Sequence, residues 1–403
     1  MRVLSLGGCG QMGRHFVETA VKLKAFEKLT IADYNEVVAK EYVKQLDNPL
    51  IDAIQIDAHD SIRLTEILKE YDVVVSTIGP YYLFGTVVLE AAIDANCHYI
   101  DICDDPDPTL ELLKLCEKAK KNNITAIIGM GASPGIANLL ASKAIGTLGV
   151  VENVITTWGS LSLTDELDNM EPEMGAALEH WVEQFTGTIT VFKNKKLVKV
   201  RPLKTLKFRV PSLGHIKTHT IGHPEPVTLP RTFPSIQSSN NAMVFSRVLI
   251  QTLKIAQKRV DKKGHSIKQV ADVLRKVFIQ SDLSDLSFFE TMKIMLASTQ
   301  DSIFGRKYMP AEISATVSRE EQNKEYVCSA WLNGAIPGGM GPNTSVPTAI
   351  ALRMLGDGNI TKYGVYAPEG IINPDIFFDL LEPFVTKKNT NLPLISVKSE
   401  VYS

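Results

Sequence analysis

Short apolar runs of strand length alternate with segments of helical spacing from residue 2 to residue 129. The strand-like runs are Arg2–Leu6, Leu29–Asp33, Ile51–Asp57, Val73–Thr77, Tyr99–Ile102 and Thr125–Gly129. Between the last two, the apolar residues of Thr109–Lys120 recur on one face of a helix. Such alternation predicts an α/β fold, a doubly wound parallel sheet with helices on both faces. Ligands of such sheets bind beyond the carboxyl ends of the strands, so the chemistry is expected there.

The first strand is followed directly by a glycine-rich loop, residues 8–13, of the form G-x-G-x-x-G. A helical segment and a second strand come next, and that strand ends in Asp33, twenty residues after Gly13. Strand, glycine loop, helix, strand and acid together are the fingerprint of a dinucleotide-binding Rossmann-type domain. The glycines let backbone approach a pyrophosphate, whose charge the helix N-terminus stabilises. Asp33 is then expected to accept hydrogen bonds from the ribose hydroxyls.

The neighbouring strand ends extend this predicted cofactor site. Tyr34 and Asn35 follow Asp33 without an arginine that would receive a 2′-phosphate, so the sequence favours NAD, with NADP possible. After the third strand, either Asp57, Ala58 and His59 flank the adenine, or Asp57 and Asp60 cap the next helix, and both interpretations stay open. Small residues after the fourth strand leave space for the nicotinamide side. The cofactor-binding candidates are Gly8, Gly10, Gln11, Met12, Gly13, Asp33, Asp57, Ala58, Ser76, Thr77, Gly79 and Pro80.

The middle of the chain predicts a second α/β domain, for substrate binding or dimerisation, with a helical insertion at about 240–300. Its strand candidates are Val154–Thr157, Thr188–Phe192, Leu197–Arg201, Thr218–Ile221, Ile313–Arg319 and Glu325–Leu332, and its helices are Ala242–Lys258, His265–Phe278 and Leu286–Leu296. The polar turn Lys193–Lys196 suits a hairpin. The expected division is residues 1–132, 133–342 and 343–403. The last segment returns to the first domain through a helix that Pro347 can start and a short strand at Gly364–Tyr366.

The composition is that of a soluble globular protein, with 44% hydrophobic residues, 22% charged residues and a net charge of −2. This charge gives no reason to expect nucleic acid or an acidic membrane as a partner. No apolar stretch has membrane-spanning length and the five cysteines are scattered, so a cytoplasmic protein is expected. His215, His219 and His223 recur at a spacing of four, but without nearby cysteines we expect no metal site. Residues His223–Pro226 are instead expected to form a rigid loop of the substrate domain.

Several short motifs resemble the saccharopine dehydrogenase family. They are Gly79-Pro80-Tyr81, Tyr99-Ile100-Asp101, the turn of residues 131–136, Thr344–Ala351 and Gly364–Glu369. The resemblance implies an NAD(P)-dependent oxidoreductase that transfers hydride at a CH–NH or CH–NH2 bond of an amino acid or opine-like secondary amine, in lysine or amino-acid metabolism. Ser133 and Asn138 stand where saccharopine-forming members carry aspartate and histidine. The turn is therefore closer to lysine-6-dehydrogenase-like members, and saccharopine, lysine and carboxynorspermidine stay open as substrates. A homodimer is expected.

Chemistry at a C–N bond needs a titratable group near the imine nitrogen and water. Tyr81, Asp104 and His98 are the candidates, in that order. The alternatives are a packed loop aromatic for Tyr81, a helix-terminal aspartate for Asp104 and a strand residue with satisfied hydrogen bonds for His98. Ser133 and Arg231 are the candidates for binding substrate, with Arg306 as an alternative guanidinium. Ser133 is also the expected N-cap of the helix that follows, with Pro134 at its first position. The other function that the sequence allows is a non-catalytic dinucleotide-binding regulatory protein on the same fold.

Overall fold

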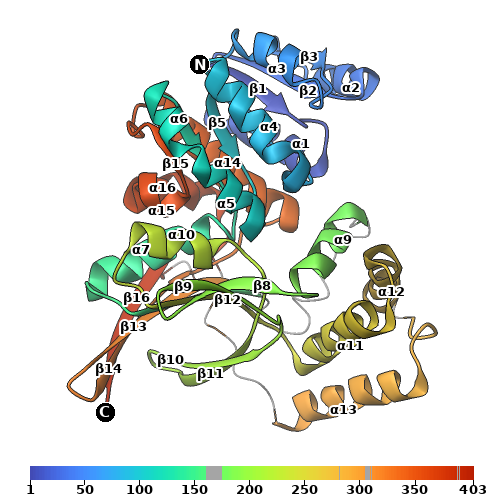
Figure 1. Cartoon of the computed structure of the whole chain (residues 1–403), viewed down its shortest axis with the longest axis vertical. Helices are drawn as coiled ribbons and strands as arrows, with labels where there is room; N and C mark the ends of the chain where they lie inside the picture. Colours follow the sequence, from blue (N-terminus) through green and yellow to red (C-terminus); the bar gives the residue numbers. More distant parts are fainter. Residues whose placement is uncertain (160–174, 281, 305–308, 310, 388, 390) are drawn as a thin grey trace. The chain divides into compact units, whose positions relative to one another are not determined.

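The structure, a computed structural model of the chain, describes residues 1–159, 175–280, 282–304, 309, 311–387, 389 and 391–403. Two compact units are formed (Figure 1): unit 1 is Met1–Ser142 with Ala335–Lys387, and unit 2 is Lys143–Gly334 with Lys388–Ser403. This division differs from the expected one at residues 132 and 342. The first boundary falls inside helix α7 (Ile136–Leu148), and the last strand of the chain belongs to unit 2 because it pairs with an edge strand there.

Unit 1 is built on a seven-stranded sheet, and its strands run parallel in the order β15-β6-β5-β4-β1-β2-β3. The central strands β1 and β4 are buried almost throughout, as expected where helices cover both faces of a parallel sheet. The predicted doubly wound α/β fold is therefore confirmed. The strands are β1 (Arg2–Leu6), β2 (Lys28–Asp33), β3 (Ile51–Gln55), β4 (Val73–Ser76), β5 (His98–Asp101), β6 (Thr125–Ile127) and β15 (Gly364–Tyr366).

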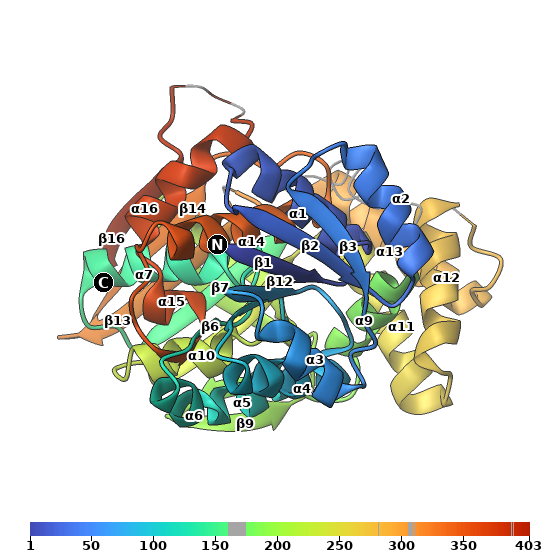
Figure 2. The same ribbon diagram turned by 90° about the horizontal axis from the view of Figure 1, so that it is seen from above.

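Helices cover both faces of this sheet (Figure 2). On one face α1 packs against α14, and on the other α3, α4 and α5 pack in succession. The helices are α1 (Gln11–Leu23), α2 (Glu36–Leu46), α3 (Ser61–Leu68), α4 (Tyr81–Asp94), α5 (Pro106–Lys114), α6 (Cys116–Lys121), α14 (Met340–Gly356), α15 (Pro368–Ile371), α16 (Pro374–Leu381) and the short η1 (Glu382–Phe384). The predicted single helix Thr109–Lys120 is wrong, because the chain divides it at Leu115 into α5 and α6.

Two other helix starts differ from the sequence prediction. Ser133 is not the N-cap of α7, because a bridge between Gly131 and Gly135 holds the residues between them in a turn and the helix begins at Ile136. Pro347 does not start α14 but lies inside it. The helix begins at Met340, and the Asn343 side chain in its first turns donates to the carbonyls of Gly339 and Ile336, at 2.7 and 3.1 Å.

The segment before residue 388 packs on the beginning of the chain. Ser345 Oγ donates to the carbonyl of Met12 at 2.7 Å, and Thr348 Oγ1 donates to the carbonyl of Met130 at 2.6 Å. β15 continues the sheet beside β6, parallel to it. Both predicted elements of this segment, a helix and a short strand, are thus part of unit 1.

Unit 2 contains a nine-stranded sheet along which β10-β11-β12-β7-β13-β14-β16 follow one another; β8 also pairs with β12, and β9 pairs with β8. Most neighbours are antiparallel, and β12 and β7 are parallel. The predicted hairpin at Lys193–Lys196 is confirmed: Asn194 and Lys195 both take positive φ angles, as a two-residue hairpin turn requires. The strands are β7 (Asn153–Gly159), β8 (Ile189–Lys193), β9 (Lys196–Val200), β10 (Thr205–Val210), β11 (Gly214–Thr220), β12 (Ser238–Val244), β13 (Ile313–Glu321), β14 (Lys324–Leu332) and β16 (Ile395–Tyr402).

The helices of unit 2 are α9 (Gly175–Gln184), α10 (Glu225–Thr232), α11 (Arg247–Lys263), α12 (Ile267–Ile279) and α13 (Phe288–Phe304). The predicted helix Ala242–Lys258 is wrong at its start, because β12 extends to Val244 between two other strands. The loop predicted at His223–Pro226 is instead the entry to α10.

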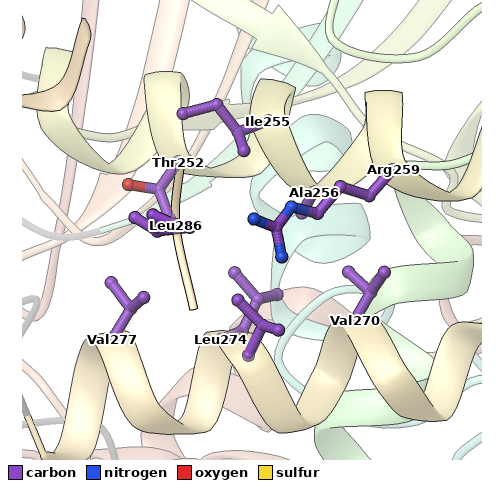
Figure 3. Close-up of a pocket in the computed structure, with 9 residues that line it drawn as sticks. Thr252, Ile255, Ala256, Arg259, Val270, Leu274, Val277 and Leu286 are labelled. Carbon is purple, nitrogen blue, oxygen red and sulfur yellow. The ribbon is translucent and has the colours of Figure 1, made fainter. Parts of the chain in front are cut away.

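A core cluster joins α9, α11 and α12 around Phe185 and Leu253. The cavity between α11 and α12 (Figure 3) holds only about 10 Å³, too little for a ligand. Among the described residues no helix is long and apolar enough to cross a bilayer.

Candidate active site

The glycine loop is closed so tightly that side chains are excluded from it. Gly7 N donates to the carbonyl of Ala32 at 2.8 Å, and Gly10 N donates to the carbonyl of Gly7 at 3.0 Å. A Cβ on Gly13 would lie 2.6 Å from Gly8 Cα and would collide with the Gly7 carbonyl. Helix α1 therefore starts directly against the end of β1, and its first N–H groups have no acceptor within the helix. This helix N-terminus is where the sequence predicts that the pyrophosphate binds, and that role stays a prediction.

Asp33 and Arg14 both bind the backbone of Cys9. The Asp33 carboxylate accepts from Cys9 N at 3.3 Å, and Arg14 Nε donates to the Cys9 carbonyl at 2.9 Å. The Arg14 guanidinium also lies 4.1 Å from the centre of the Tyr42 ring, whose hydroxyl donates to the Arg14 carbonyl. Burial and the Asp33 carboxylate raise the pKa of the Cys9 thiol to about 11, so it stays neutral. No arginine directly follows Asp33 in the sequence. Helix α1 instead brings the Arg14 side chain to Cys9, the residue that Asp33 also contacts.

The end of β4 lies against the glycine loop. Thr77 Oγ1 donates to the carbonyls of Leu6 and Gly7, at 3.1 and 3.2 Å. Ser76 is buried, and a Cβ on Gly79 would meet nothing within 4 Å. The strand end therefore offers backbone with open space beside Gly79, and its role on the nicotinamide side of the cofactor stays a prediction.

Asp57 and Ala58 lie between β3 and α3, in a turn where Asp57 forms its hydrogen bonds with His59 of the same turn. The Asp57 carboxylate accepts from His59 N at 2.9 Å and lies 2.9 Å from its Nδ1, and these contacts lower the pKa of Asp57. The cap of α3 is Asp60, which accepts from Arg63 N. The capping expected of Asp60 is thus confirmed and that of Asp57 is wrong, while the role of Asp57 beside the adenine stays a prediction.

Tyr81 begins α4 and has a buried hydroxyl. It donates to the Ser76 carbonyl at 3.1 Å and accepts from Ile102 N at 3.3 Å, so it joins the ends of β4 and β5. Burial, reinforced by the Asp101 carboxylate, raises the pKa of Tyr81 well above its ordinary value. A buried phenol already bonded to two backbone groups is poorly placed to exchange protons with a substrate. The geometry thus favours the structural alternative for Tyr81.

Asp101 is a buried carboxylate whose role the sequence analysis missed, although it noted the strand end that contains it. The side chain accepts from Tyr99 Oη at 2.8 Å, from Cys103 N at 3.0 Å and from Gly129 N at 2.7 Å. Burial raises the pKa of Asp101 to about 6 despite these bonds. Together with Tyr81 it links the ends of β4, β5 and β6 into one polar edge. An acid at the last position of a strand otherwise made of apolar and aromatic residues was the available signal.

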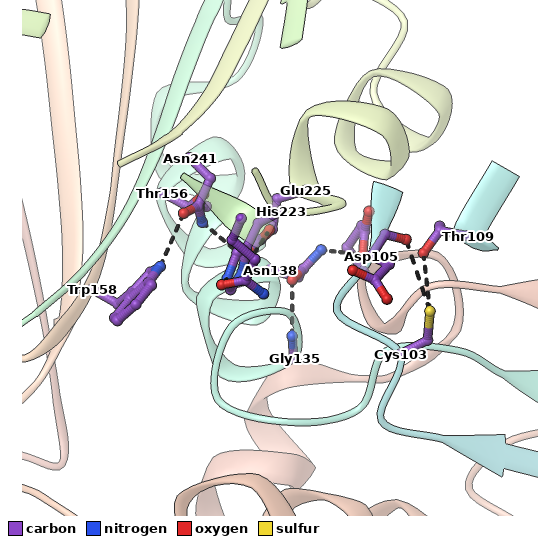
Figure 4. Close-up of polar contacts among 12 residues, drawn as sticks. Cys103, Asp105, Thr109, Gly135, Asn138, Thr156, Trp158, His223, Glu225 and Asn241 are labelled. Atoms are coloured by element: carbon purple, nitrogen blue, oxygen red, sulfur yellow. Dashed lines mark hydrogen bonds and ion pairs between the residues drawn. The ribbon is translucent and has the colours of Figure 1, made fainter. Parts of the chain in front are cut away.

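Asp104 and Ser133 follow β5 and β6 at this edge, and both are half-buried. The turn that contains Ser133 is held by Asn138, whose Oδ1 accepts from Gly135 N at 2.9 Å and whose Nδ2 donates to Glu369 at 2.8 Å (Figure 4). Asn138 is buried and supports the turn. The roles predicted for Asp104 and Ser133 stay predictions.

His98 lies at the wrong edge of the sheet for its predicted role. It is the first residue of β5 and pairs with Val73, the first residue of β4, at the amino ends of the strands. Its Nδ1 accepts from Thr125 N at 3.1 Å, and burial lowers the pKa of the imidazole. The glycine loop follows the carboxyl ends, so the structure removes His98 from the candidate acids and bases.

Unit 2 contains a buried polar network around His223 and Glu225 (Figure 4). Asn241 Nδ2 donates to Glu225 at 2.9 Å and to Thr156 Oγ1 at 3.0 Å, and Trp158 Nε1 donates to Asn241 Oδ1 at 3.0 Å. His223 lies 3.7 Å from Glu225 on one side and 3.3 Å from the Gln184 amide on the other. Burying a carboxylate and an imidazole together costs folding free energy, which makes this pair a candidate functional group.

The remaining candidates of unit 2 are dispersed. Arg231 lies in the last turn of α10 and is exposed, so its substrate role stays a prediction, while Arg306 lies outside the described residues. His215 is exposed and His219 is buried on β11, four residues apart, or about 13 Å along the strand. His223 lies beyond that strand, so the three histidines do not share one strand face.

Comparison with known proteins confirms the resemblance seen in the motifs. Residues 3–127 match the model of the saccharopine dehydrogenase NADP binding domain. A saccharopine dehydrogenase-like oxidoreductase of Mus musculus is 31% identical over 112 residues, which are 26% of this chain and 26% of that protein. A lipid droplet localized protein of Caenorhabditis elegans is 26% identical over 167 residues, 38% of this chain and 39% of that protein. The matched parts thus span well under half of these relatives.

The fold has a full-length counterpart among solved structures. The apo saccharopine dehydrogenase (L-Glu forming) of Saccharomyces cerevisiae covers 100% of both chains with a TM-score of 0.63 and 16% identity. At this identity the likeness establishes the shared fold. The match of residues 3–127 adds that the first region is similar to a saccharopine dehydrogenase NADP binding domain.

Proposed function

We propose that this protein is a cytoplasmic NAD(P)-dependent oxidoreductase that moves a hydride at a C–N bond of an amino acid or an opine-like secondary amine. The observation that carries the proposal is the closed glycine loop with Asp33, at the carboxyl edge of a parallel sheet. The match of residues 3–127 supports the nucleotide part. The proposed specificity for a CH–NH or CH–NH2 donor is inferred from the resemblance of short motifs, including the turn at residues 131–136.

The residues at this edge fit a dinucleotide. Gly8 and Gly13 have no room for a Cβ, whereas Gly79 faces open space. The N–H groups at the start of α1 would hold the pyrophosphate and Asp33 the ribose hydroxyls. When bound, the nicotinamide supplies the hydride chemistry.

Arg14 bears on the choice between NAD and NADP. We propose that Asp33 makes NAD(H) the better ligand and that Arg14 allows NADP(H) to bind through its 2′-phosphate. Loss of a hydrogen bond to a charged group costs about 1.5–3 kcal/mol, so Arg14→Ala should weaken NADP(H) binding roughly tenfold or more and leave NAD(H) nearly unchanged. Asp33→Ala should weaken NAD(H) by about 1–2 kcal/mol.

Fluorescence titration of both cofactors measures these effects. Lys22→Ala, at the far end of α1, is the control for loss of a positive charge on the same helix. A clear preference of the wild type for NADP(H), or an equal loss of both cofactors in Arg14→Ala, would contradict the assignment.

Two carboxylates are the candidates for moving protons. Of the three acid–base candidates predicted from the sequence, Asp104 remains, and it directly follows β5 at the carboxyl edge of the sheet of unit 1. Glu225 of unit 2 is added because it is buried with His223. Each would exchange a proton with the substrate nitrogen or with water. Asp104→Asn and Glu225→Gln keep the shape of the side chain and remove its titration, so a true proton carrier should lose kcat and one arm of the pH profile while cofactor binding persists.

A substrate screen tests the function as a whole. Lysine, saccharopine and carboxyalkylated polyamines are each added to protein and cofactor, and the absorbance of the reduced nicotinamide is followed in both directions. We expect turnover with one class of amine, abolished by Asp33→Ala at low cofactor concentration and recovered at high concentration.

The alternative function, a non-catalytic dinucleotide-binding regulatory protein, is favoured by two observations. The Tyr81 hydroxyl is committed to backbone groups, and Asn138, where related enzymes carry histidine, supports a turn. This alternative predicts tight cofactor binding with no turnover of any amine in the screen.

A further inference from the structure

Helix α13 carries an apolar surface that the described residues of unit 2 leave open to solvent. Seven large apolar side chains of this one helix are between 49% and 77% exposed. We call them the outer stripe: Phe288, Phe289, Met292, Met295, Leu296, Ile303 and Phe304. Most soluble monomers expose such residues singly, so seven of them on one helix require an explanation.

The outer stripe is a true helix face. At 100° per residue, its members other than Phe304 fall within an arc of about 120°. The buried residues Glu290, Ile294 and Ala297 lie on the opposite side and pack towards the unit. Helix α13 is thus apolar on its outer side while its inner side is occupied.

The helix is fixed in this orientation by ion pairs to α11, against which it packs (Figure 1). Glu290 accepts from Arg259 Nη2 at 2.7 Å and from Lys263 Nζ at 3.2 Å. Asp301 accepts from Arg247 Nη1 at 2.7 Å. Rotating α13 to bury the outer stripe would break these pairs and leave the buried Glu290 without its cations, so the stripe stays on the outside.

We propose that a second copy of this chain covers the outer stripe, with α13 pairing antiparallel to α13 of the partner about a twofold axis near Leu296. Antiparallel pairing about this axis brings Phe289 opposite Ile303 at both ends, so the surface is self-complementary, as an isologous interface must be. Three phenylalanines of about 150–250 Å² each, roughly three-quarters exposed, together with the four partly exposed methionine, leucine and isoleucine side chains, offer roughly 800 Å² of surface per copy. That is about the contribution of one partner to a stable interface of standard size.

The charges favour a protein partner over a lipid surface. Helices that lie on membranes carry many lysines and arginines on their polar face. In α13, all of whose residues are described, Lys293 is the one exposed charged side chain. The cations beside its polar face, Arg247, Arg259 and Lys263, are engaged with Asp301 and Glu290. This inference does not depend on the proposed function.

Sedimentation velocity of the full chain over a wide concentration range tests the proposal, with Leu296→Glu as the disrupting variant. Two glutamates would face each other at the axis, and we expect the dissociation constant of the dimer to rise on the order of a hundredfold. The matched control is Ile62→Glu, which places the same charge at an isolated, 79% exposed position on α3 and should leave the dimer intact. Circular dichroism of both variants checks that the fold is unchanged.

Leu296→Cys adds a direct geometric test, because mild oxidation should join two copies through this residue in the dimer and should not do so for Ile62→Cys. A dimer that Leu296→Glu weakens and Leu296→Cys cross-links supports the proposal. A monomeric wild type at all concentrations, or a dimer indifferent to Leu296→Glu, would overturn it. So would a monomer that floats with phosphatidylcholine–phosphatidylserine vesicles and loses this binding in Leu296→Glu, because the stripe would then be a membrane surface.

Discussion

Replacing Asp101 by asparagine removes a buried carboxylate from the point where β5 meets β6. The wild-type carboxylate accepts three hydrogen bonds, from Tyr99, Cys103 and Gly129. Burial outweighs these bonds and raises the pKa of Asp101 from 3.8 to about 6. Asparagine keeps an oxygen that can accept from the two backbone N–H groups, and it no longer titrates.

The sign of the pH dependence is set by this raised pKa. Between pH 3.8 and about 6 the folded protein holds a proton on Asp101 that the unfolded chain has lost. Stability therefore falls as the pH rises through this window, and the loss is complete above it. For these two pKa values the linkage relation gives a loss of about 2 kcal/mol between pH 4.5 and pH 7.5.

Hydrogen exchange of the β5 and β6 peptides is the suitable assay. Tryptophan fluorescence would report the other unit, because all three tryptophans, Trp158, Trp181 and Trp331, lie in unit 2. Opening free energies, corrected for the intrinsic exchange rate, are compared between wild type and Asp101→Asn at pH 4.5 and pH 7.5. The difference at pH 4.5 gives the cost of the altered hydrogen bonds, and its change up to pH 7.5 gives the ionisation effect. Asp107→Asn, at an exposed position of α5, controls for loss of one negative charge.

We expect the variant to gain about 2 kcal/mol relative to the wild type on going from pH 4.5 to pH 7.5. A constant difference between the two proteins across this range would show that Asp101 does not titrate there. The argument from burial would then be wrong, and the three hydrogen bonds would dominate the pKa instead.

Two further predictions concern the glycine loop and the anchor of α13. Gly13→Ala should abolish dinucleotide binding in fluorescence titrations, since its Cβ would lie 2.6 Å from Gly8 Cα, whereas Gly146→Ala in α7, with nothing within 4 Å, should bind normally. Burial alone would raise the pKa of Glu290, but the hydrogen bonds from Arg259, Ser287 N and Lys263 lower it to about 2. The stability that Glu290 supplies should therefore be present above pH 4.5 and lost as the pH falls towards 2. At pH 7, Glu290→Gln should lower the free energy of unfolding by about 2 kcal/mol, measured by urea unfolding with tryptophan fluorescence. The control Glu320→Gln, at an exposed position, should leave it unchanged. If the stability of Glu290→Gln fell towards pH 2 as steeply as that of the wild type, the ion pair would not be the cause.

The sequence by itself determined the elements whose signals are local. The six strands of the first region, the G-x-G-x-x-G loop and Asp33 all depend on short-range patterns, and the structure has every one of these strands within a few residues of its predicted bounds. The hairpin at Lys193–Lys196 is also local, because its turn chemistry lies in the two residues that form it. Where long-range packing competes, the sequence prediction was wrong. Residues 242–244 share the helical spacing of residues 245–258, but they complete β12 between β7 and β11.

The tertiary structure alone decided which side chains share the edge of the sheet. His98 is the first residue of β5 and Asp101 is its last, so Asp101 lies at the carboxyl edge of the sheet, beside the glycine loop, and His98 at the opposite edge. In an extended strand of four residues the two ends are about 10 Å apart. Arg14 reaches Cys9 from α1, although no local pattern marks it as a partner of Asp33's site. Tyr81 was placed correctly at a strand end, but only packing shows that its hydroxyl is buried between two backbone groups. Hydrophobic periodicity encodes which face of an element is buried, whereas the partners of a polar side chain depend on contacts between residues far apart in the chain.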